Sequence, residues 1–195
     1  TRSLIVTGVQ TCALPILIEA RIRDLRKQAV GKAFQQALFG DDAAMRVAVS
    51  DQYAFEFAPH AYAPSRDYDG RFGQFDFRKH FYGRMGDFDS QEEFECACQL
   101  DMWAQQGRIQ FWVRNLVRRE GCSFFLQKAD GRFYPDFVCQ LPGGVVLVVE
   151  YKGANAWLGA EDDRLIGGLW ANLSEGRCRF VMVKDKHWDW VAEKL

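Results

Sequence analysis

The sequence predicts an α/β fold in which a mixed β-sheet is flanked by helices. Helical periodicity covers 90–106 and 161–173, and short runs rich in Val, Leu and Phe lie between and after these two segments. The run 145–149 is apolar on both alternating faces, which is typical of a central strand covered on both sides. The predicted order of elements is therefore α-β-β-β-β-α-β over residues 90–195, preceded by an extension over residues 17–89.

Composition narrows the class of protein. The chain has 195 residues, of which 48% are hydrophobic, and this is enough apolar material for one domain with a core and an N-terminal extension. The net charge of −1 does not by itself indicate a nucleic-acid partner. It does not exclude one either, because a local basic rim and an acidic metal site together also give a net charge near zero. No apolar run is long enough to cross a bilayer, so we expect no membrane partner.

The first residues differ in character from the rest. Residues 6–16, VTGVQTCALPI, resemble the translation of a common short-read sequencing adapter. A secretory signal peptide explains them less well, because only Arg2 precedes the apolar stretch and no small-residue cleavage site follows it. We therefore expect residues 1–16 to be a sequencing artefact or disordered, and the native sequence upstream of about Leu17 to have been replaced or lost.

The cysteines indicate a cellular compartment. Cys12 lies in the adapter-like segment, and the other cysteines are scattered, without a C-x-x-C pair or a neighbouring histidine: Cys96, Cys98, Cys122, Cys139 and Cys178. This spacing argues against a zinc site and against the disulfide framework of a secreted protein. It favours buried, reduced thiols in a cytoplasmic protein.

Residues 17–89 are predicted to form a helix followed by aromatic-rich strands and loops. Apolar spacing indicates a helix over 18–39, and 45–49 fits a short strand. The aromatic residues of 53–88 have two interpretations. They form an irregular wall over the core, with the alternation of Phe75 and Phe77 predicting half-buried strands, or they stack on nucleic-acid bases beside nearby cations, which are Arg71, Arg78 and Lys79.

The helix over 90–106 carries a carboxylate on its buried face. Ser90 as N-cap and Glu93 three residues later match a capping box. At about 100° per residue, Glu93 falls near the middle of the apolar stripe, which consists of Cys96, Ala97, Leu100, Trp103 and Ala104. Glu93 is therefore either a capping residue or a carboxylate offered to a site in the core.

Two strands are expected next, over 109–113 and 123–127. The basic residues Arg114, Arg118 and Arg119 lie between them, near the predicted sheet edge. This cluster fits contacts with DNA phosphates, and it fits equally well a basic turn that faces solvent.

The segment 133–153 is predicted to be a hairpin with charges at its open end. If its loop is the three residues Pro142, Gly143 and Gly144, Asp136 lies opposite Glu150 on one face, roughly 4.5 to 5.5 Å apart at Cβ, and two carboxylates there can hold one hard cation. Lys152 follows on the same face. A two-residue loop would place Asp136 and Glu150 on opposite faces and remove the site.

The remaining elements follow in the expected order. After Lys152 comes a loop containing Trp157, then a helix over 161–173 and a strand over 178–183. The aromatic segment 187–190 is predicted to be a packed helix.

Pro135-Asp136, a hairpin and then Glu150-Tyr151-Lys152 together resemble the signature of the PD-(D/E)XK nuclease superfamily. The resemblance implies a restriction-endonuclease-like core and a deoxyribonuclease that uses Mg²⁺, for which Mn²⁺ can substitute. It implies that Asp136 and Glu150 bind the metal, that the Tyr151 backbone carbonyl adds a ligand, and that Lys152 helps to activate the attacking water. It also places Glu93, from the first helix, in the same site.

The surrounding segments EEFECACQLD, WVRN, FYPDFV and VVEYKG further resemble the C-terminal nuclease region of proteins related to the helicase-nuclease subunit of type III restriction enzymes, over 75–183. This implies double-stranded DNA as substrate, and a helicase region lost upstream and a modification subunit as partners. No G-x-x-x-x-G-K-[ST] loop for ATP is present. The alternative is a catalytically silent nuclease-fold module that binds DNA or docks onto a helicase, and the intact Asp136, Glu150 and Lys152 argue against it.

Overall fold

The structure is a computed structural model that describes residues 21, 25, 57–58, 60–119, 122–128 and 131–195. The chain divides into two compact units, Thr1–Ala48 and Val49–Leu195, and every element named below belongs to the second. The adapter-like residues 1–16 and the predicted strand 45–49 lie outside the described residues, as does the predicted helix 18–39 apart from Arg21 and Leu25, which are helical.

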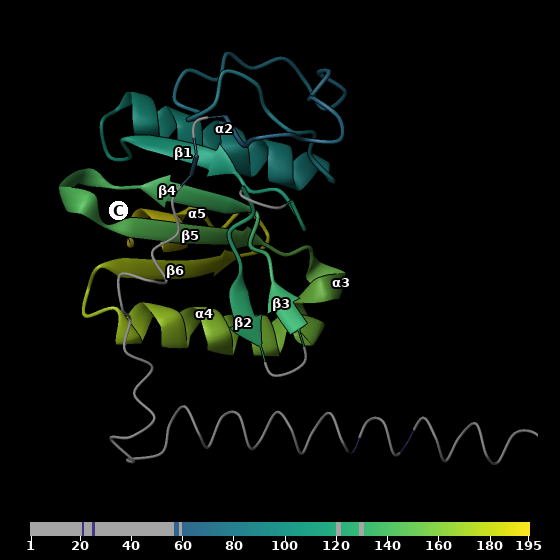
Figure 1. Cartoon of the computed structure of the whole chain (residues 1–195), viewed down its shortest axis with the longest axis vertical. Coiled ribbons are helices and arrows are strands. Elements are labelled where there is room, and N and C mark those ends of the chain that lie inside the picture. The colour runs from purple at the N-terminus through teal and green to yellow at the C-terminus, as the bar shows by residue number, and fades with distance from the viewer. Residues whose placement is uncertain (1–20, 22–24, 26–56, 59, 120–121, 129–130) are drawn as a thin grey trace, which may run out of the picture. The chain divides into compact units, whose positions relative to one another are not determined.

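A mixed sheet of four strands forms the centre of the second unit (Figure 1), with the order β1-β4-β5-β6. The strands are β1 (Phe111–Arg114), β4 (Phe137–Gln140), β5 (Val146–Tyr151) and β6 (Cys178–Val183). β1 pairs with β4 and β4 with β5 antiparallel, whereas β5 and β6 are parallel. A second, two-stranded sheet consists of β2 (Leu126–Lys128) and β3 (Gly131–Phe133). The predicted mixed sheet flanked by helices is confirmed.

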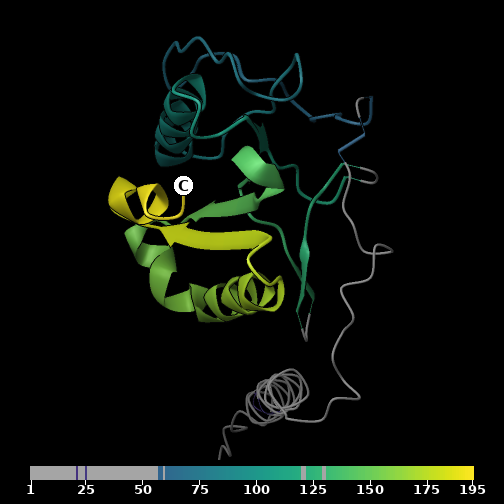
Figure 2. The same cartoon turned by 90° about the vertical axis from the view of Figure 1, so that its left-hand side faces the viewer.

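The helices cover both faces of this sheet. They are α2 (Gln91–Gln105), α3 (Ala154–Trp157), α4 (Glu161–Leu173) and α5 (Trp188–Ala192), and a 3₁₀ turn, Leu158–Ala160, joins α3 to α4. Figure 2 shows α5 and the β2–β3 hairpin on opposite sides of the sheet. No helix in the described ranges has the length and apolarity needed to cross a membrane.

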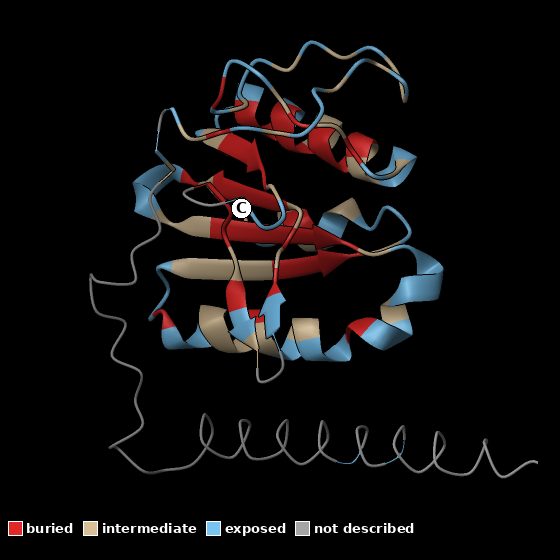
Figure 3. Ribbon diagram, turned by 45° about the vertical axis from the view of Figure 1, so that its right-hand side comes forward, coloured by how far each residue is buried: buried red, intermediate tan, exposed pale blue. Residues whose placement is uncertain are grey.

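Strand β5 is buried on both faces, as its apolar run predicts (Figure 3). Leu147 and Val149 belong to a core cluster with residues of α2 and α5. Val148 faces the other way and packs with Leu126 of β2 and Phe133 of β3. Ile166 and Trp170 of α4 pack against this second cluster. The two faces of β5 are therefore covered by different elements, α2 and α5 on one side and the β2–β3 hairpin with α4 on the other.

The hairpin between β4 and β5 has the three-residue loop on which the predicted site depends. The Leu141 N–H donates to the Val145 carbonyl at 2.8 Å, and Phe137 pairs with Val149. Gly143 has a φ of 80° and Gly144 of 84°, values that side chains disfavour, so the two glycines allow this tight connection. The alternative two-residue loop is excluded.

The predicted order α-β-β-β-β-α-β lacks the strand β3, and the predicted loop at Trp157 contains the helix α3. Three predicted boundaries also need correction. The hairpin arm begins at Phe137 and not at Phe133, because Pro135 has no N–H for the ladder and Phe133 pairs with Leu126 instead. The strand expected over 123–127 is Leu126–Lys128, since the Ser123 N–H donates to the Arg119 carbonyl and not to a neighbouring strand. Strand β1 likewise begins two residues later than expected.

The aromatic segment before α2 is a wall over the core, but it is not built of strands. Phe75 and Phe77 have irregular backbone, so the half-buried strands predicted from their alternation are wrong. Within the described residues, the β-type pairing of this segment consists of two isolated bridges, Asp67 with Gly86 and His80 with Trp112. Ring contacts replace strand pairing: the Phe77 and Trp112 centroids are 5.5 Å apart.

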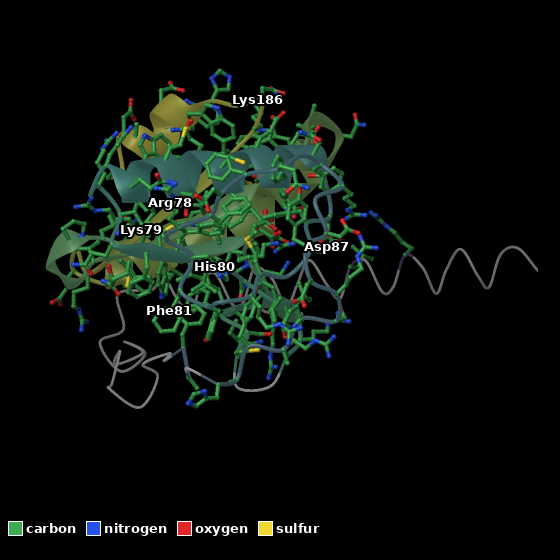
Figure 4. All side chains as sticks on the ribbon, turned by 90° about the horizontal axis from the view of Figure 1, so that it is seen from above. Arg78, Lys79, His80, Phe81, Asp87 and Lys186 are labelled. Carbon is green, nitrogen blue, oxygen red and sulfur yellow. The ribbon has the colours of Figure 1, made fainter. Side chains whose placement is uncertain are left out.

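A buried carboxylate fastens this wall to the helix. Asp101 of α2 is fully buried and accepts hydrogen bonds from the Lys79 N–H at 2.9 Å, the Arg78 N–H at 3.2 Å, Trp112 Nε1 at 2.9 Å and Gln105 Nε2 at 2.6 Å. In Figure 4 the run from Arg78 to Phe81 passes from α2 towards β1. Asp101 thus joins the wall, the helix and the sheet at one point.

Candidate functional site

Asp136 and Glu150 face each other at the open end of the hairpin, as predicted. The Asp136 N–H donates to Glu150 Oε2 at 2.9 Å, and the Tyr151 N–H donates to Asp136 Oδ2 at 2.8 Å. The side chain of Glu150 is 3% exposed and that of Asp136 is 14% exposed. Each carboxylate is therefore oriented by a backbone N–H of the opposite strand, which holds the pair in place.

Lys152 lies on the same face as Glu150, which confirms the predicted geometry. Its Nζ is 2.5 Å from Glu150 Oε1 and 3.9 Å from Asp163 Oδ2. Asp163 is in the first turn of α4 and also pairs with Lys128 of β2 at 2.9 Å. Asp163 and Lys128 were not predicted as site residues, because the acidic start of α4 (Glu161, Asp162, Asp163) is the ordinary composition of a helix N-terminus.

Glu93 approaches the site from α2, and its carboxylate contacts both the backbone before the helix and a buried arginine. Ser90 Oγ accepts from the Glu93 N–H at 3.1 Å, so Ser90 is the N-cap. Glu93 Oε2 accepts from the Asp89 N–H at 3.2 Å, one residue before the expected partner of a capping box, and from Arg114 Nη2 at 2.9 Å. The capping box is therefore incomplete, and the Glu93 carboxylate holds the chain just before the helix while it pairs with a buried cation.

Arg114 joins Glu93 to the hairpin carboxylates. As the last residue of β1 it lies opposite Phe137, and its side chain is only 6% exposed. Its Nη1 is 4.0 Å from Asp136 Oδ1. Arg114 is thus separated from the other members of the predicted basic cluster, since Arg118 and Arg119 are exposed. Its guanidinium balances carboxylates inside the protein, which the spacing of the three arginines did not indicate.

The three carboxyl groups share a shift in pKa. Burial, together with the negative charge of Glu150, raises the pKa of Asp136 to about 8. Burial and the charge of Asp136 raise the pKa of Glu93 to about 7. Burial also raises the pKa of Glu150 to about 7, although Lys152 opposes it. Desolvated carboxylates held close together favour the uptake of a proton or a cation.

The oxygen atoms at this site are of the kind that bind a hard cation, although the described residues do not form a complete metal-binding group. No three His, Cys, Asp or Glu side chains among them are placed to hold one ion, and Glu93 is occupied by Arg114. Asp136 and Glu150 supply carboxylate oxygens. The Tyr151 N–H points to Asp136, and because the N–H and C=O of one strand residue project to the same edge, its carbonyl lies on that side as well. Oxygen donors of this kind suit Mg²⁺.

Asn115 is a buried residue for which no role was predicted, although it belongs to the segment WVRN. Its Nδ2 donates to the Pro135 carbonyl at 2.7 Å and to the Phe124 carbonyl at 2.8 Å, and its Oδ1 accepts from the Phe124 N–H at 2.9 Å. Its own N–H donates to the Asp136 carbonyl at 2.8 Å. Asn115 therefore positions the Pro135-Asp136 backbone.

We expect Asn115→Ala to lower the free energy of unfolding by roughly 2–4 kcal/mol, because it removes the three buried hydrogen bonds of the Asn115 side-chain amide. Urea unfolding followed by circular dichroism measures this. Asn172→Ala, at an exposed position of α4, is the matched control and should change stability by less than about 0.5 kcal/mol. Equal stabilities of the two variants would contradict the positioning role.

The cysteines that fall in the described ranges are all free thiols: Cys96, Cys98, Cys122, Cys139 and Cys178. This agrees with the reduced state predicted for them. Burial raises the pKa of the Cys139 thiol, whose side chain is fully enclosed. Cys96 and Cys139 belong to the core, and the charges of Asp136 and of the other carboxylates of the site add to burial in raising the pKa of the Cys96 thiol.

In comparisons with known proteins, no family model, no curated protein and no solved structure matches this chain.

Proposed function

We propose that this chain is a cytoplasmic, Mg²⁺-dependent DNA endonuclease domain that hydrolyses phosphodiester bonds in double-stranded DNA. The observation that carries the proposal is the cross-strand pair of Asp136 and Glu150, with Lys152 at 2.5 Å from Glu150 on the same face. The order of α2, the antiparallel strands β1, β4 and β5, then α4 and the parallel β6 is consistent with a restriction-endonuclease-like core. A helicase region and a modification subunit as partners belong to the same proposal.

Asp136, Glu150 and the Tyr151 carbonyl would hold the metal. A Mg²⁺ ion held there would supply polarisation of the scissile phosphate and a lower pKa for a nearby water. In the hydrolysis, the water oxygen would bond to phosphorus and give up a proton to solvent, while a P–O bond to one deoxyribose would break and the departing oxygen would take up a proton from solvent. The chain's own residues orient the reactants and balance the developing charge.

Lys152 acts as a cation in this scheme and not as a base. Burial lowers its pKa, but the charge of Glu150 more than offsets this, and the net result is a raised pKa. Lys152 therefore stays an ammonium at neutral pH, able to orient the attacking water and to stabilise the phosphate oxygens. Asp163, at 3.9 Å, helps to hold its Nζ at the mouth of the site.

A nicking assay on supercoiled plasmid tests the proposal. We expect the wild type to convert plasmid to the open-circular form with Mg²⁺ or Mn²⁺ and not with chelator. Lys152→Ala should lower the rate by about 100-fold or more, because it removes a charge aimed at the transition state. Lys194→Ala, at an exposed position near the C-terminus, should retain the wild-type rate. A wild type that cuts with neither metal, or an undiminished Lys152→Ala protein, would refute the nuclease.

One observation favours the alternative, a nuclease-fold module that binds DNA or docks onto a helicase without cutting. Arg114, and not a third free carboxylate, stands between Glu93 and Asp136. A cation of the protein itself can thus neutralise part of the site. Plasmid binding without nicking in the same assay would select this module.

A further inference from the structure

A pocket of about 240 Å³ lies beside the charged site and shares Arg114 with it. Its other walls come from the segment before α2 and from the turn after β1. The lining residues that matter here are Arg66, Arg114, Arg119, Ser65, Leu116 and Val117. Asp87, labelled in Figure 4, lines the wall that precedes α2.

The pocket is built by contacts that fix its two walls to each other. The Tyr62 hydroxyl donates to the Arg114 carbonyl at 2.9 Å and accepts from the Gly86 N–H at 3.1 Å. A Cβ on Gly86 would lie 2.9 Å from Leu116 Cδ2 and 3.1 Å from Pro64 Cβ, so the two walls approach each other closely at this glycine. The Arg119 N–H donates to Ser123 Oγ at 2.6 Å, which anchors the base of that side chain. The pocket therefore exists before any ligand binds.

The charge in this pocket favours an anion. Asp87 is already paired with Arg66 and with Arg71. Asp89 is 84% exposed and lies 3.4 Å from Arg114 Nη2. Arg119 is exposed, lines the pocket and forms no ion pair with the residues that the structure describes. A cationic donor thus remains available at the rim of the pocket.

The other part of the lining is apolar. Leu116 and Pro64 line one side, and Val117 is 54% exposed. Inorganic phosphate would leave this surface uncovered. A nucleotide has both parts, a phosphate for the arginines and a flat base and sugar for the apolar wall.

We infer that this pocket binds one nucleotide of a DNA strand, next to the phosphodiester at the site of Asp136 and Glu150. The inference rests on the proposed function, since it places that strand across the hairpin end. Arg114 connects the two places because it contacts Glu93 at one side and lines the pocket at the other. Arg119 would hold the phosphate of the bound nucleotide, while Leu116 and Val117 contact its base or sugar.

The test compares two neighbouring arginines in chelator, where no cleavage occurs. Both Arg118 and Arg119 are exposed, but only Arg119 lines the pocket. Fluorescence anisotropy with a labelled single-stranded oligonucleotide should show at least about tenfold weaker binding for Arg119→Ala, and a salt slope smaller by about one. Arg118→Ala should bind within about twofold of the wild type. Equal losses in both variants would indicate general surface attraction and overturn the pocket.

Methyl NMR separates the possible ligands. The Leu116 and Val117 methyl resonances should shift and saturate with thymidine monophosphate, and should not move with the same concentration of inorganic phosphate. The oligonucleotide should saturate them at a concentration at least about tenfold lower. An oligonucleotide that binds no more tightly than the mononucleotide would overturn the assignment to a strand, and unmoved methyl resonances would overturn the site itself.

These readouts do not require catalysis, so the two proposals can fail separately. If plasmid is not nicked but the methyl resonances respond, the nuclease is refuted and the pocket stands as a nucleotide site of a non-cutting module. If plasmid is nicked and Arg119→Ala binds DNA like the wild type, the pocket is refuted and the nuclease stands.

Discussion

Asp136→Asn is expected to melt at or above the wild-type temperature in chelator, and to gain nothing from Mg²⁺. In the absence of metal, burial and the charge of Glu150 disfavour an ionised Asp136, as its raised pKa of about 8 shows. Asparagine is the uncharged isostere and keeps an oxygen to accept from the Tyr151 N–H. The wild type should gain about 1.4 kcal/mol at a Mg²⁺ concentration tenfold above the dissociation constant.

The same prediction has a pH dependence whose sign follows from the raised pKa values. The ordinary pKa is 3.8 for Asp136 and 4.5 for Glu93 and Glu150, and in the folded protein these values rise to about 8, 7 and 7. The folded state therefore binds more protons than the unfolded state between these limits. The stabilisation that these groups contribute is complete below about pH 4 and is lost as pH rises towards 8.

Thermal melts from pH 5 to pH 8, with chelator and with Mg²⁺, measure both effects. In chelator the advantage of Asp136→Asn over the wild type should grow with pH, because only the wild type keeps an ionisable group at this position. Asp76→Asn, at a side chain that is 74% exposed, is the control and should respond to Mg²⁺ as the wild type does.

A structural ion pair would give the opposite result. If Asp136 served to neutralise Arg114, its removal would leave a buried cation short of a partner and cost roughly 3–5 kcal/mol with or without metal. A strongly destabilised Asp136→Asn, together with a wild type that is indifferent to divalent cations, would refute the metal site and leave the non-cutting module.

Asp101→Ala is expected to lower the free energy of unfolding by about 3–5 kcal/mol, the largest loss that we predict for a single residue. The change removes the acceptor of four donors, and Trp112 Nε1 among them is fully buried and would have no water to replace it. The backbone of Arg78 and Lys79 would lose its link to α2, so the aromatic wall should loosen as well.

Urea unfolding at neutral pH, followed by tryptophan fluorescence and by circular dichroism, measures this loss. Asp101→Asn retains one acceptor and should fall between the wild type and Asp101→Ala. Asp76→Ala removes only an exposed ion pair with Arg78 and should cost less than about 1 kcal/mol. A midpoint for Asp101→Ala equal to that of Asp76→Ala would show that the wall is held by its ring contacts alone.

Much of the charged site could be predicted from local signals. A Pro-Gly-Gly turn between apolar arms limits the hairpin to two registers, and the sequence by itself determined that in the three-residue register Asp136 faces Glu150 with Lys152 beside it. The hydrogen bonds of the hairpin selected that register. The N-cap at Ser90 and the limits of α4 and β6 were equally local, because capping residues and periodicity act within a few positions.

Only the tertiary structure decided which groups neutralise and position these carboxylates. Arg114 looked like a member of a basic surface cluster, but pairing of β1 with β4 turns it towards Glu93, which lies 21 positions away in the chain. Asn115 reaches Pro135 and Asp101 reaches Lys79 over similar separations. Such contacts arise where a helix, a sheet and an irregular wall meet, and the periodicity of a single segment carries no information about the partner that another segment brings to it.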